Sequence, residues 1–309
     1  MRIYVTGSRG YIGSLLVVHF RSYRCQVFEN QCDIRDYDKL LAEIVTAAPD
    51  VIIHLAACST VAKCEKYPHR ALTTNAIGTR NIISIMKVAG CSNIIYASSC
   101  AVYGHSLYPL TEYSKLNPLS VYGTTKLLGE LCIRQSNVRY VIMRMSNVVG
   151  FHSHLPRRSD GTIKSKDRLF GSLFNCTQNG TPFTLYGSNY HTKDGTCSRD
   201  YIHVQDVVHA YYLSALRLHL RRGRTLSLTV AEPMKVILNL ASGTNHTVGE
   251  IIRMWQDHNY HSGKPDLQLI IGDRRAGDPD SIAMTIHQLF QYLNWRPRLE
   301  ISDIIGSYY

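Results

Sequence analysis

The sequence predicts an α/β protein in which a doubly wound parallel sheet carries a smaller C-terminal α/β lobe. Short segments rich in β-branched residues alternate with amphipathic helical segments through roughly the first half of the chain, as is typical of a parallel sheet with helices on both faces. A glycine-rich turn directly follows the first of these segments. The 309 residues are 45% hydrophobic and 18% charged, so the chain is long enough for about two domains and too apolar to be disordered.

Strands and helices alternate along the first 150 residues. Each predicted strand is a short run rich in Val, Ile, Tyr or Phe, and the run at 51–55 is apolar apart from His54, as expected for a strand buried on both faces. The predicted strands are residues 2–6, 26–29, 51–55, 93–98 and 140–145. Apolar residues spaced three and four apart predict helices at 11–22, 37–47, 69–89 and 121–136.

Residues 151–167 interrupt this pattern. They have no apolar periodicity and include Pro, Gly and several basic residues, so we expect an exposed loop and a domain boundary there. The sequence predicts a first domain at 1–150 and a second at 151–309, with part of about 200–240 returning to the first sheet. Weaker patterns predict helices at 169–178, 204–218, 248–257 and 286–293, and strands at 183–186 and 236–240.

Composition argues against several classes of protein. The apolar runs are far shorter than the roughly 20 residues of a membrane helix, and the chain opens on a strand rather than an apolar leader, so we expect a cytoplasmic protein. The nine cysteines are scattered and contain no C-x-x-C pair, which indicates reduced and mostly buried thiols. We expect no metal site, because His152 and His154 lack a third ligand nearby in the sequence.

The chain is basic, with a formal charge of +11 from 34 Lys and Arg against 23 Asp and Glu. Such a charge favours an anionic partner, and nucleic acid, a nucleotide and a phosphorylated sugar all qualify. Four arginines cluster where a helical pattern ends, and we interpret them as a solvated helix end favoured by the helix dipole. They are Arg217, Arg221, Arg222 and Arg224.

A glycine motif lies between the first predicted strand and the helix that follows it. Gly7, Gly10 and Gly13 are spaced three apart, with Tyr11 and Ile12 opening the helix. Glycines at this spacing permit a tight turn and close approach of the backbone to a pyrophosphate, while the helix N-terminus offers free N–H groups to the anion. The motif and its context predict a Rossmann-like, dinucleotide-binding first domain.

A second group combines Tyr122 and Lys126 with Ser99, which ends an apolar strand. Residues four apart share a helix face, so the Lys126 ammonium can lie beside the Tyr122 phenol. A neighbouring positive charge lowers the pKa of a phenol from about 10, which makes tyrosine a usable general base. Ser99 can hydrogen-bond the same substrate oxygen. We interpret the three residues as the catalytic group.

Together these segments resemble the extended short-chain dehydrogenase/reductase superfamily. The resemblance rests on Gly7-x-x-Gly10-x-x-Gly13, His54-Leu-Ala-Ala, Ser98-Ser-Cys-Ala-Val-Tyr-Gly104 and Tyr122-Gly-Thr-Thr-Lys126. Three further segments narrow it to the UDP-glucose 4-epimerases. They are Arg144-Met-Ser-Asn147-Val-Val-Gly150, Asp194-Gly-Thr-Cys-Ser-Arg199-Asp-Tyr-Ile-His-Val and Arg274-Arg275-Ala-Gly-Asp278-Pro. The similarity covers nearly the whole chain.

The resemblance implies a role for each matching residue. Ser99, Tyr122 and Lys126 would be catalytic, and Lys126 would also contact the NAD cofactor. The other implied NAD-binding residues are Gly7, Gly10, Tyr11, Ile12, Gly13, Glu29, Asp33, Ile34, Leu55, Ala56, Ala57 and Asn75. A UDP-sugar would contact Ser99, Tyr122, Asn147, Arg168, Leu169, Thr184, Tyr186, Arg199, Arg275 and Asp278. Two arginines from separate segments also suit a diphosphate on chemical grounds.

Several residues depart from the family pattern. The loop after the second strand is short, which makes Glu29 the candidate for the adenosine ribose and places Asp33 and Ile34 along the adenine. Ser59 and Arg168 stand where the family usually has Lys and Asn. Arg9 lies inside the glycine motif, and a cation near the ribose can accommodate a 2′-phosphate, so NADP is not excluded.

The resemblance implies an NAD-dependent isomerase of galactose metabolism that inverts C4 of a UDP-hexose through a transient 4-keto sugar, acting as a homodimer. Another nucleotide sugar, such as UDP-GlcNAc or UDP-glucuronate, and NADPH-dependent reduction of a keto sugar remain alternatives. A 4,6-dehydratase is disfavoured because Cys100 and Ala101 replace its Asp-Glu pair. A nucleotide sensor or RNA-binding protein on this scaffold is disfavoured because such proteins commonly lose the Tyr or Lys retained here at 122 and 126.

Overall fold

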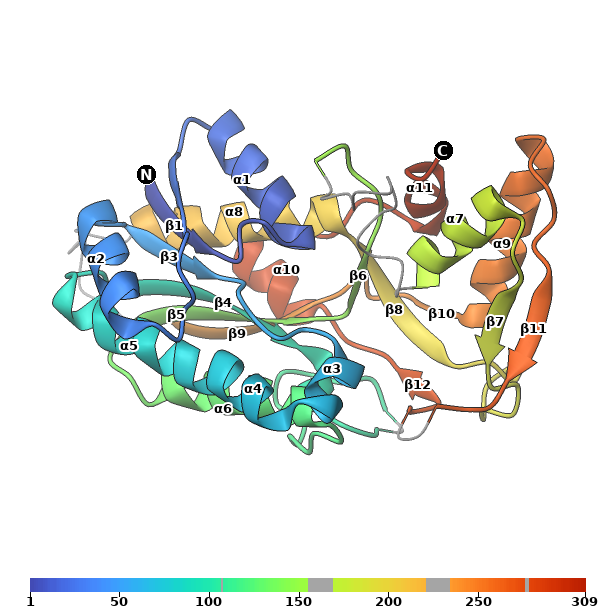
Figure 1. The fold of residues 1–309 in the computed structure, drawn as a ribbon, viewed down its shortest axis with the longest axis horizontal. Coiled ribbons are helices and arrows are strands. Elements are labelled where there is room, and N and C mark those ends of the chain that lie inside the picture. The colour runs from blue at the N-terminus through green and yellow to red at the C-terminus, as the bar shows by residue number, and fades with distance from the viewer. Residues whose placement is uncertain (107, 155–168, 221–233, 276–277) are drawn as a thin grey trace.

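The protein folds around a six-stranded parallel sheet with the strand order β2-β1-β3-β4-β5-β9 (Figure 1). The computed structural model describes residues 1–106, 108–154, 169–220, 234–275 and 278–309. The strands are β1 Arg2–Thr6, β2 Gln26–Glu29, β3 Val51–His54, β4 Asn93–Ser99, β5 Arg139–Met145 and β9 Lys235–Leu240. After β2 the chain crosses β1 to form β3, so a topological switch point lies beside β1, where ligands of such sheets bind. The predicted fold class is confirmed.

Helices cover both faces of this sheet, because successive strand residues point to opposite sides. Ile3 and Val5 face α1 (Tyr11–Ser22) and α8 (Val204–Leu220) in one apolar core. Tyr4 belongs to a second core on the other face. This core is covered by α2 Tyr37–Ala47, α5 Gly78–Val88 and α6 Val121–Arg134 (Figure 1).

Residues well beyond 150 complete the first sheet. β9 pairs in parallel with β5, with Leu238 opposite Met143. α8 packs on the first core through buried residues that include Val207 and Tyr211, and α10 (His287–Leu293) joins the same core through Leu289. The basic cluster after α8 lies mostly outside the described residues. Of its members Arg217 is described, and its guanidinium lies 5.0 Å from the ring centre of Tyr292.

The C-terminal lobe has its own core around Trp255, which donates a hydrogen bond to Thr177 Oγ1 at 3.0 Å. Its helices are α7 Leu169–Asn179, α9 Val248–His261 and α11 Ile301–Gly306. β7 and β11 form a parallel pair, and β8 pairs with β6, β10 and β12. These strands are β6 Asn147–Val149, β7 Phe183–Tyr186, β8 Ser198–His203, β10 Asn245–Thr247, β11 Leu269–Gly272 and β12 Ser281–Ile282.

The helix predicted at 69–89 is divided. α4 (Pro68–Leu72) leads through a π-helical turn at Thr73–Ile77 into α5, and a separate α3 (Val61–Lys66) precedes it. The π turn carries Asn75, whose side chain accepts from the Cys58 N–H at 2.7 Å and donates to Thr125 Oγ1 at 2.9 Å. Such turns occur often beside functional sites.

Two further expectations concern cysteines and membranes. All nine cysteines are free, but only Cys64 and Cys91 are buried, so the expectation of mostly buried thiols was wrong. The other seven are partly exposed; Cys25, Cys32, Cys58 and Cys197 lie between elements, and Cys100, Cys132 and Cys176 lie within helices. Within the described ranges, every helix is too short or too polar to cross a membrane.

Candidate active site

The turn between β1 and α1 is built on glycine. Gly7 has φ +70°, and a Cβ there would lie 2.7 Å from the Ala56 nitrogen. A Cβ at Gly13 would lie 2.2 Å from the Gly7 carbonyl oxygen, so α1 begins directly against the turn. Among the described residues no side chain caps the helix at Gly10, and its first N–H groups are therefore available to an anion. The turn fits a dinucleotide pyrophosphate.

The segment after β2 forms the next part of the wall. Asp33 and Ile34 line the cavity as expected, and Asp33 forms an ion pair with Arg35 at 2.6 Å that lowers the pKa of its carboxyl. Glu29 does not line the cavity, because its carboxylate pairs at 2.9 Å with Arg21 of α1. Its contact with the adenosine ribose stays a prediction.

The end of β3 supplies Leu55, Ala56 and Ala57 to the wall, followed by Ser59. His54 is buried behind them and bridges Thr6 and Thr79 with contacts of 2.7 and 3.0 Å. Burial lowers the pKa of His54 to about 3, so the ring is a neutral structural element. Asn75 also lies behind the wall, where its side chain bonds the backbone N–H and C=O of Cys58, and its contact with NAD stays a prediction.

Ser99, Tyr122 and Lys126 all line the same cavity. The N-cap of α6 is Ser120, whose hydroxyl accepts from the Gly123 N–H at 3.0 Å. A Cβ at Gly123 would lie 2.3 Å from the Ala101 carbonyl oxygen, so α6 packs tightly on the short 3-10 helix that follows Ser99. This close packing brings Ser99 near the start of α6, the helix that carries Tyr122 and Lys126.

Lys126 is buried in a polar and aromatic environment. Its ammonium lies 4.2 Å from the ring centre of Tyr96, and burial lowers its pKa to about 7, opposed by the nearby Glu130 carboxylate. Glu130, one turn further along α6, accepts from Arg144 Nε at 3.0 Å and Nη2 at 2.7 Å and from Ser98 Oγ at 2.5 Å. Arg144 and Glu130 are 1% and 0% exposed. α6 is therefore anchored by a fully buried ion pair.

At the other end of the cavity lie the residues expected to hold a sugar nucleotide. Arg199 of β8 pairs with Asp278 at 2.5 Å, and the guanidinium of Arg275 lies 4.2 Å from the ring centre of Tyr186. Ile282 on β12 is opposite Arg199 in the strand register and also lines the cavity. The remaining expected residues that line this end are Asn147, Leu169 and Thr184. Arg168 lies outside the described residues.

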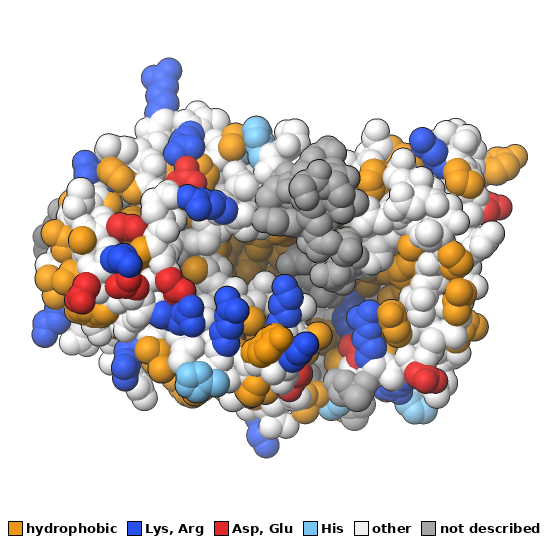
Figure 2. All heavy atoms as spheres, viewed as in Figure 1, with side chains coloured by type: hydrophobic (Ala, Val, Ile, Leu, Met, Phe, Trp, Pro, Cys, Tyr) orange, Lys and Arg blue, Asp and Glu red, His pale blue; other side chains and the backbone are white. Residues whose placement is uncertain are grey.

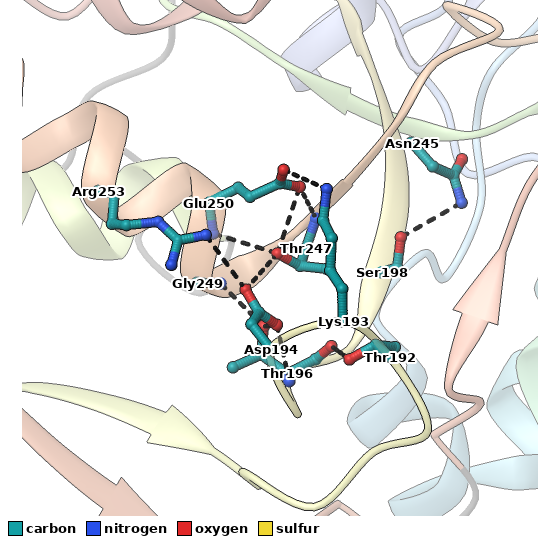
Figure 3. A network of polar contacts seen from close by, with 10 residues as sticks. All are labelled: Thr192, Lys193, Asp194, Thr196, Ser198, Asn245, Thr247, Gly249, Glu250 and Arg253. Atoms are coloured by element: carbon teal, nitrogen blue, oxygen red, sulfur yellow. Dashed lines mark hydrogen bonds and ion pairs between the residues drawn. The ribbon is translucent and has the colours of Figure 1, made fainter.

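A polar network links the segment before β8 to the start of α9 (Figure 3). The Asp194 carboxylate accepts from Thr247 Oγ1 at 2.6 Å and from the N–H and hydroxyl of Thr196 at 3.0 and 2.8 Å. Thr247 and Glu250 form the capping box of α9. The Asp194-Gly-Thr segment is therefore a structural clamp between β8 and α9, and it does not itself line the cavity.

One cavity of about 1570 Å³ joins these parts. It exceeds the roughly 300–1,000 Å³ of a pocket for one drug-sized ligand, which suits two ligands bound together. Figure 2 shows the hollow near the middle of one face, with Lys and Arg side chains along its lower rim. The sequence interpretation missed lining residues at the carboxyl ends of parallel strands, which the rule for such sheets could have indicated. They include Cys100, Met145 and Ser146.

Of the two histidines His152 and His154, the first has a structural role. His152 Nε2 lies 3.1 Å from the Tyr11 carbonyl oxygen, beside the Tyr11 ring, and burial lowers the pKa of His152. Within the described part of the chain, no three His, Cys, Asp or Glu side chains are grouped as metal ligands.

A family model described as the NAD dependent epimerase/dehydratase family matches residues 3–224, which is well over half of the chain. The protein belongs to this family. The predicted family resemblance is thereby confirmed, and the matched range contains the glycine turn and the Ser99, Tyr122 and Lys126 group.

Relatives in this family match along the whole chain. A UDP-glucose 4-epimerase of Rhizobium leguminosarum bv. trifolii is 30% identical, over 99% of this chain and 95% of its own length. The UDP-glucose-4-epimerase of Stenotrophomonas maltophila, solved with bound NAD and formylated UDP-arabinopyranose, has a TM-score of 0.85 at 26% identity, covering 100% of this chain and 96% of its own. A Brucella ovis UDP-glucose 4-epimerase in complex with NAD has a TM-score of 0.84 at 26% identity, covering 99% and 96%.

Proposed function

We propose that the protein is an NAD-dependent epimerase that inverts C4 of a UDP-hexose through a transient 4-keto sugar. The observation that carries this proposal is the single cavity that joins the glycine turn, the Ser99, Tyr122 and Lys126 group and the Arg199–Asp278 pair. The UDP-glucose 4-epimerases among its relatives support the same conclusion. We divide the chain accordingly into a cofactor domain at 1–150 and a sugar-nucleotide domain at 151–309, with about 200–240 assigned to the first.

The glycine turn and the wall from Leu55 to Ala57 would hold NAD, with Asp33 and Ile34 along the adenosine end. The absence of a side chain at Gly7 and Gly13 is what lets the backbone approach the pyrophosphate. When bound, NAD supplies a reversible two-electron acceptor for the sugar carbon. The cofactor would then finish each cycle in the form in which it began, so the reaction needs no external oxidant.

Tyr122 is the proton acceptor in this proposal. Its phenolate oxygen takes the proton from the sugar O4 as C4 is oxidised, and returns it when C4 is reduced on the opposite face. Ser99 hydrogen-bonds the same oxygen and keeps it in line. Lys126, one turn along α6 and buried, favours the phenolate by its positive charge.

Arg199 and Arg275 would hold the diphosphate, and Asp278 would contact the uridine ribose. The charged residues of the lobe gather at this end of the cavity, and Ile282, which also lines it, would border the hexose. Firm contacts to UDP and sparse contacts to the hexose allow the 4-keto sugar to turn over while the nucleotide stays bound. Inversion requires this freedom.

The proposal is tested by incubating purified protein with UDP-galactose, without added reductant, and following UDP-glucose by NMR. We expect interconversion without accumulation of free NADH, whereas stoichiometric NADH would indicate a dehydrogenase. Tyr122→Phe should lower turnover by orders of magnitude and leave UDP affinity nearly unchanged in calorimetry, because it removes the proton acceptor and no diphosphate contact. The matched control is Tyr113→Phe, since Tyr113 is 85% exposed and lies outside the cavity. Full activity of Tyr122→Phe refutes the assignment.

We further propose that the enzyme acts in galactose metabolism, in the cytoplasm, as a homodimer. A shallow apolar groove of about 530 Å³ between α4 and α6 supports the dimer, because Leu72, Leu119 and Leu128 line it with partly exposed side chains. Large apolar side chains grouped on a surface are typical of an interface. Light scattering on the purified protein measures the oligomeric state.

A further inference from the structure

We propose that the adenosine end of the cofactor site accepts a 2′-phosphate, so that the protein binds NADP(H) in addition to NAD(H), with Arg9 as the residue that contacts the phosphate. This inference rests on the proposed dinucleotide site but not on the identity of the sugar. It follows from the side chains at the end of β2, where the ribose of a dinucleotide lies in folds of this kind.

Arg9 is brought to that position by the glycine turn. It is exposed, lines the cavity, and donates a hydrogen bond from its guanidinium to the side-chain oxygen of Gln31, two residues after β2. The guanidinium therefore spans from the pyrophosphate turn to the strand end that faces the ribose. An arginine near this hydroxyl is the usual means of accommodating a 2′-phosphate, because its planar fork can donate two hydrogen bonds to the anion.

The acidic residue that would favour an unphosphorylated ribose faces elsewhere. A carboxylate at the end of β2 accepts hydrogen bonds from a ribose diol and repels a phosphate. Glu29 occupies that place in the sequence, but its carboxylate is held at 2.9 Å by Arg21 and lies outside the cavity wall. Neutral amides at residues 30 and 31 therefore line the cavity beside the end of β2, where Glu29 does not.

The neighbouring residues keep this arrangement in place. Glu43 accepts from the Asn30 amide nitrogen and from the Gln31 backbone N–H, both at 3.1 Å, which fixes the loop with Gln31 toward Arg9. Asp33 is the carboxylate that does line the wall here, and Arg35 neutralises it with contacts of 2.6 to 3.1 Å. Arg9 adds a positive charge to this rim, where the Asp33 carboxylate is already paired with Arg35.

The test compares binding of the two adenosine halves, 2′,5′-ADP and 5′-AMP, by isothermal titration calorimetry, a readout that requires no turnover. We expect the intact protein to bind 2′,5′-ADP at least about tenfold more tightly than 5′-AMP, as one charge-assisted contact predicts. Arg9→Gln should remove this preference and leave 5′-AMP binding within about twofold. Arg134→Gln, an exposed arginine on α6 outside the cavity, is the matched control and should change neither affinity.

A second variant adds the missing carboxylate. Gln31→Glu should lower affinity for 2′,5′-ADP by at least about tenfold while 5′-AMP binding is retained, which separates loss of charge complementarity from misfolding. Equal or weaker binding of 2′,5′-ADP by the intact protein, or an unchanged preference in Arg9→Gln, overturns the inference and leaves the epimerase proposal standing. Failure to bind either nucleotide overturns the dinucleotide site, and with it both proposals.

Discussion

The buried pair of Arg144 and Glu130 makes α6 sensitive to a single substitution. Arg144→Met removes both guanidinium bonds to Glu130 and leaves the Ser98 hydroxyl as the carboxylate's donor among the described contacts. The Tyr103 hydroxyl loses a donor as well. Stranding a buried charge in this way costs about 3–5 kcal/mol, a large part of the roughly 5–15 kcal/mol by which native proteins are stable.

A second variant distinguishes the stranded charge from lost packing. In Arg144→Met/Glu130→Met both charges are replaced by apolar side chains, and such replacements are often neutral or stabilising. We therefore expect the double variant to regain most of the lost stability. The measurement is urea unfolding followed by circular dichroism at neutral pH, extrapolated to zero denaturant. A single variant that loses less than about 1 kcal/mol, or a double variant no more stable than the single one, would show that the pair does not anchor the helix.

The remaining predictions concern pH and substrate breadth. Lys126 has a folded-state pKa of about 7, well below its unfolded value of 10.5, so its contribution to the free energy of unfolding should increase between those two pH values, by at most about 1.4 kcal/mol per pH unit. Lys126→Met should lack this increase, and parallel stability–pH profiles for the two proteins would contradict the assigned burial. Ile282 is β-branched and stiff and borders the proposed hexose site, so the parent should turn over UDP-N-acetylhexosamines more slowly than UDP-hexoses. Ile282→Tyr should remove the N-acetyl activity selectively, and an unchanged ratio of kcat/KM for the two sugar pairs would mean that Ile282 lies away from the sugar.

The strands predicted at their observed bounds are those with a clear local run of strand-forming residues. β1, β2 and β7 were placed at their observed bounds, because each is a short run of strand-forming residues. β8 was missed, since Arg199, Asp200 and His203 read as exposed residues. Arg199 and Asp200 are buried with partners from distant segments: Arg199 pairs with Asp278, and Asp200 accepts from the N–H groups of Ser242 and Gly243. Hydrogen-bond partners that lie more than 40 residues away cannot be recognised from the sequence around a polar residue.

At the cavity, too, residues placed by local spacing could be predicted, and residues placed by distant partners could not. The sequence predicts that Tyr122 and Lys126 lie close together, because residues four apart share one face of a helix. It also predicts Ser99 at the end of a strand. Glu29 and Asn75 were expected at the cofactor and are not on the cavity wall. Which way each side chain turns depends on a partner in another element, Arg21 for the first and the Cys58 backbone for the second, and spacing along the chain does not reveal it.

The position of β9 has a consequence for the synthesis of the chain. This strand closes one side of the sheet, yet it is translated about ninety residues after β5, the strand it covers. Until residue 240 has left the ribosome, β5 presents an unpaired row of backbone groups flanked by buried-type side chains such as Val141 and Met143. The nascent chain therefore carries an aggregation-prone edge for the time needed to make the intervening segments. A fragment ending near residue 150 keeps that edge permanently, so expression of the first 150 residues alone is a poor route to an isolated cofactor domain.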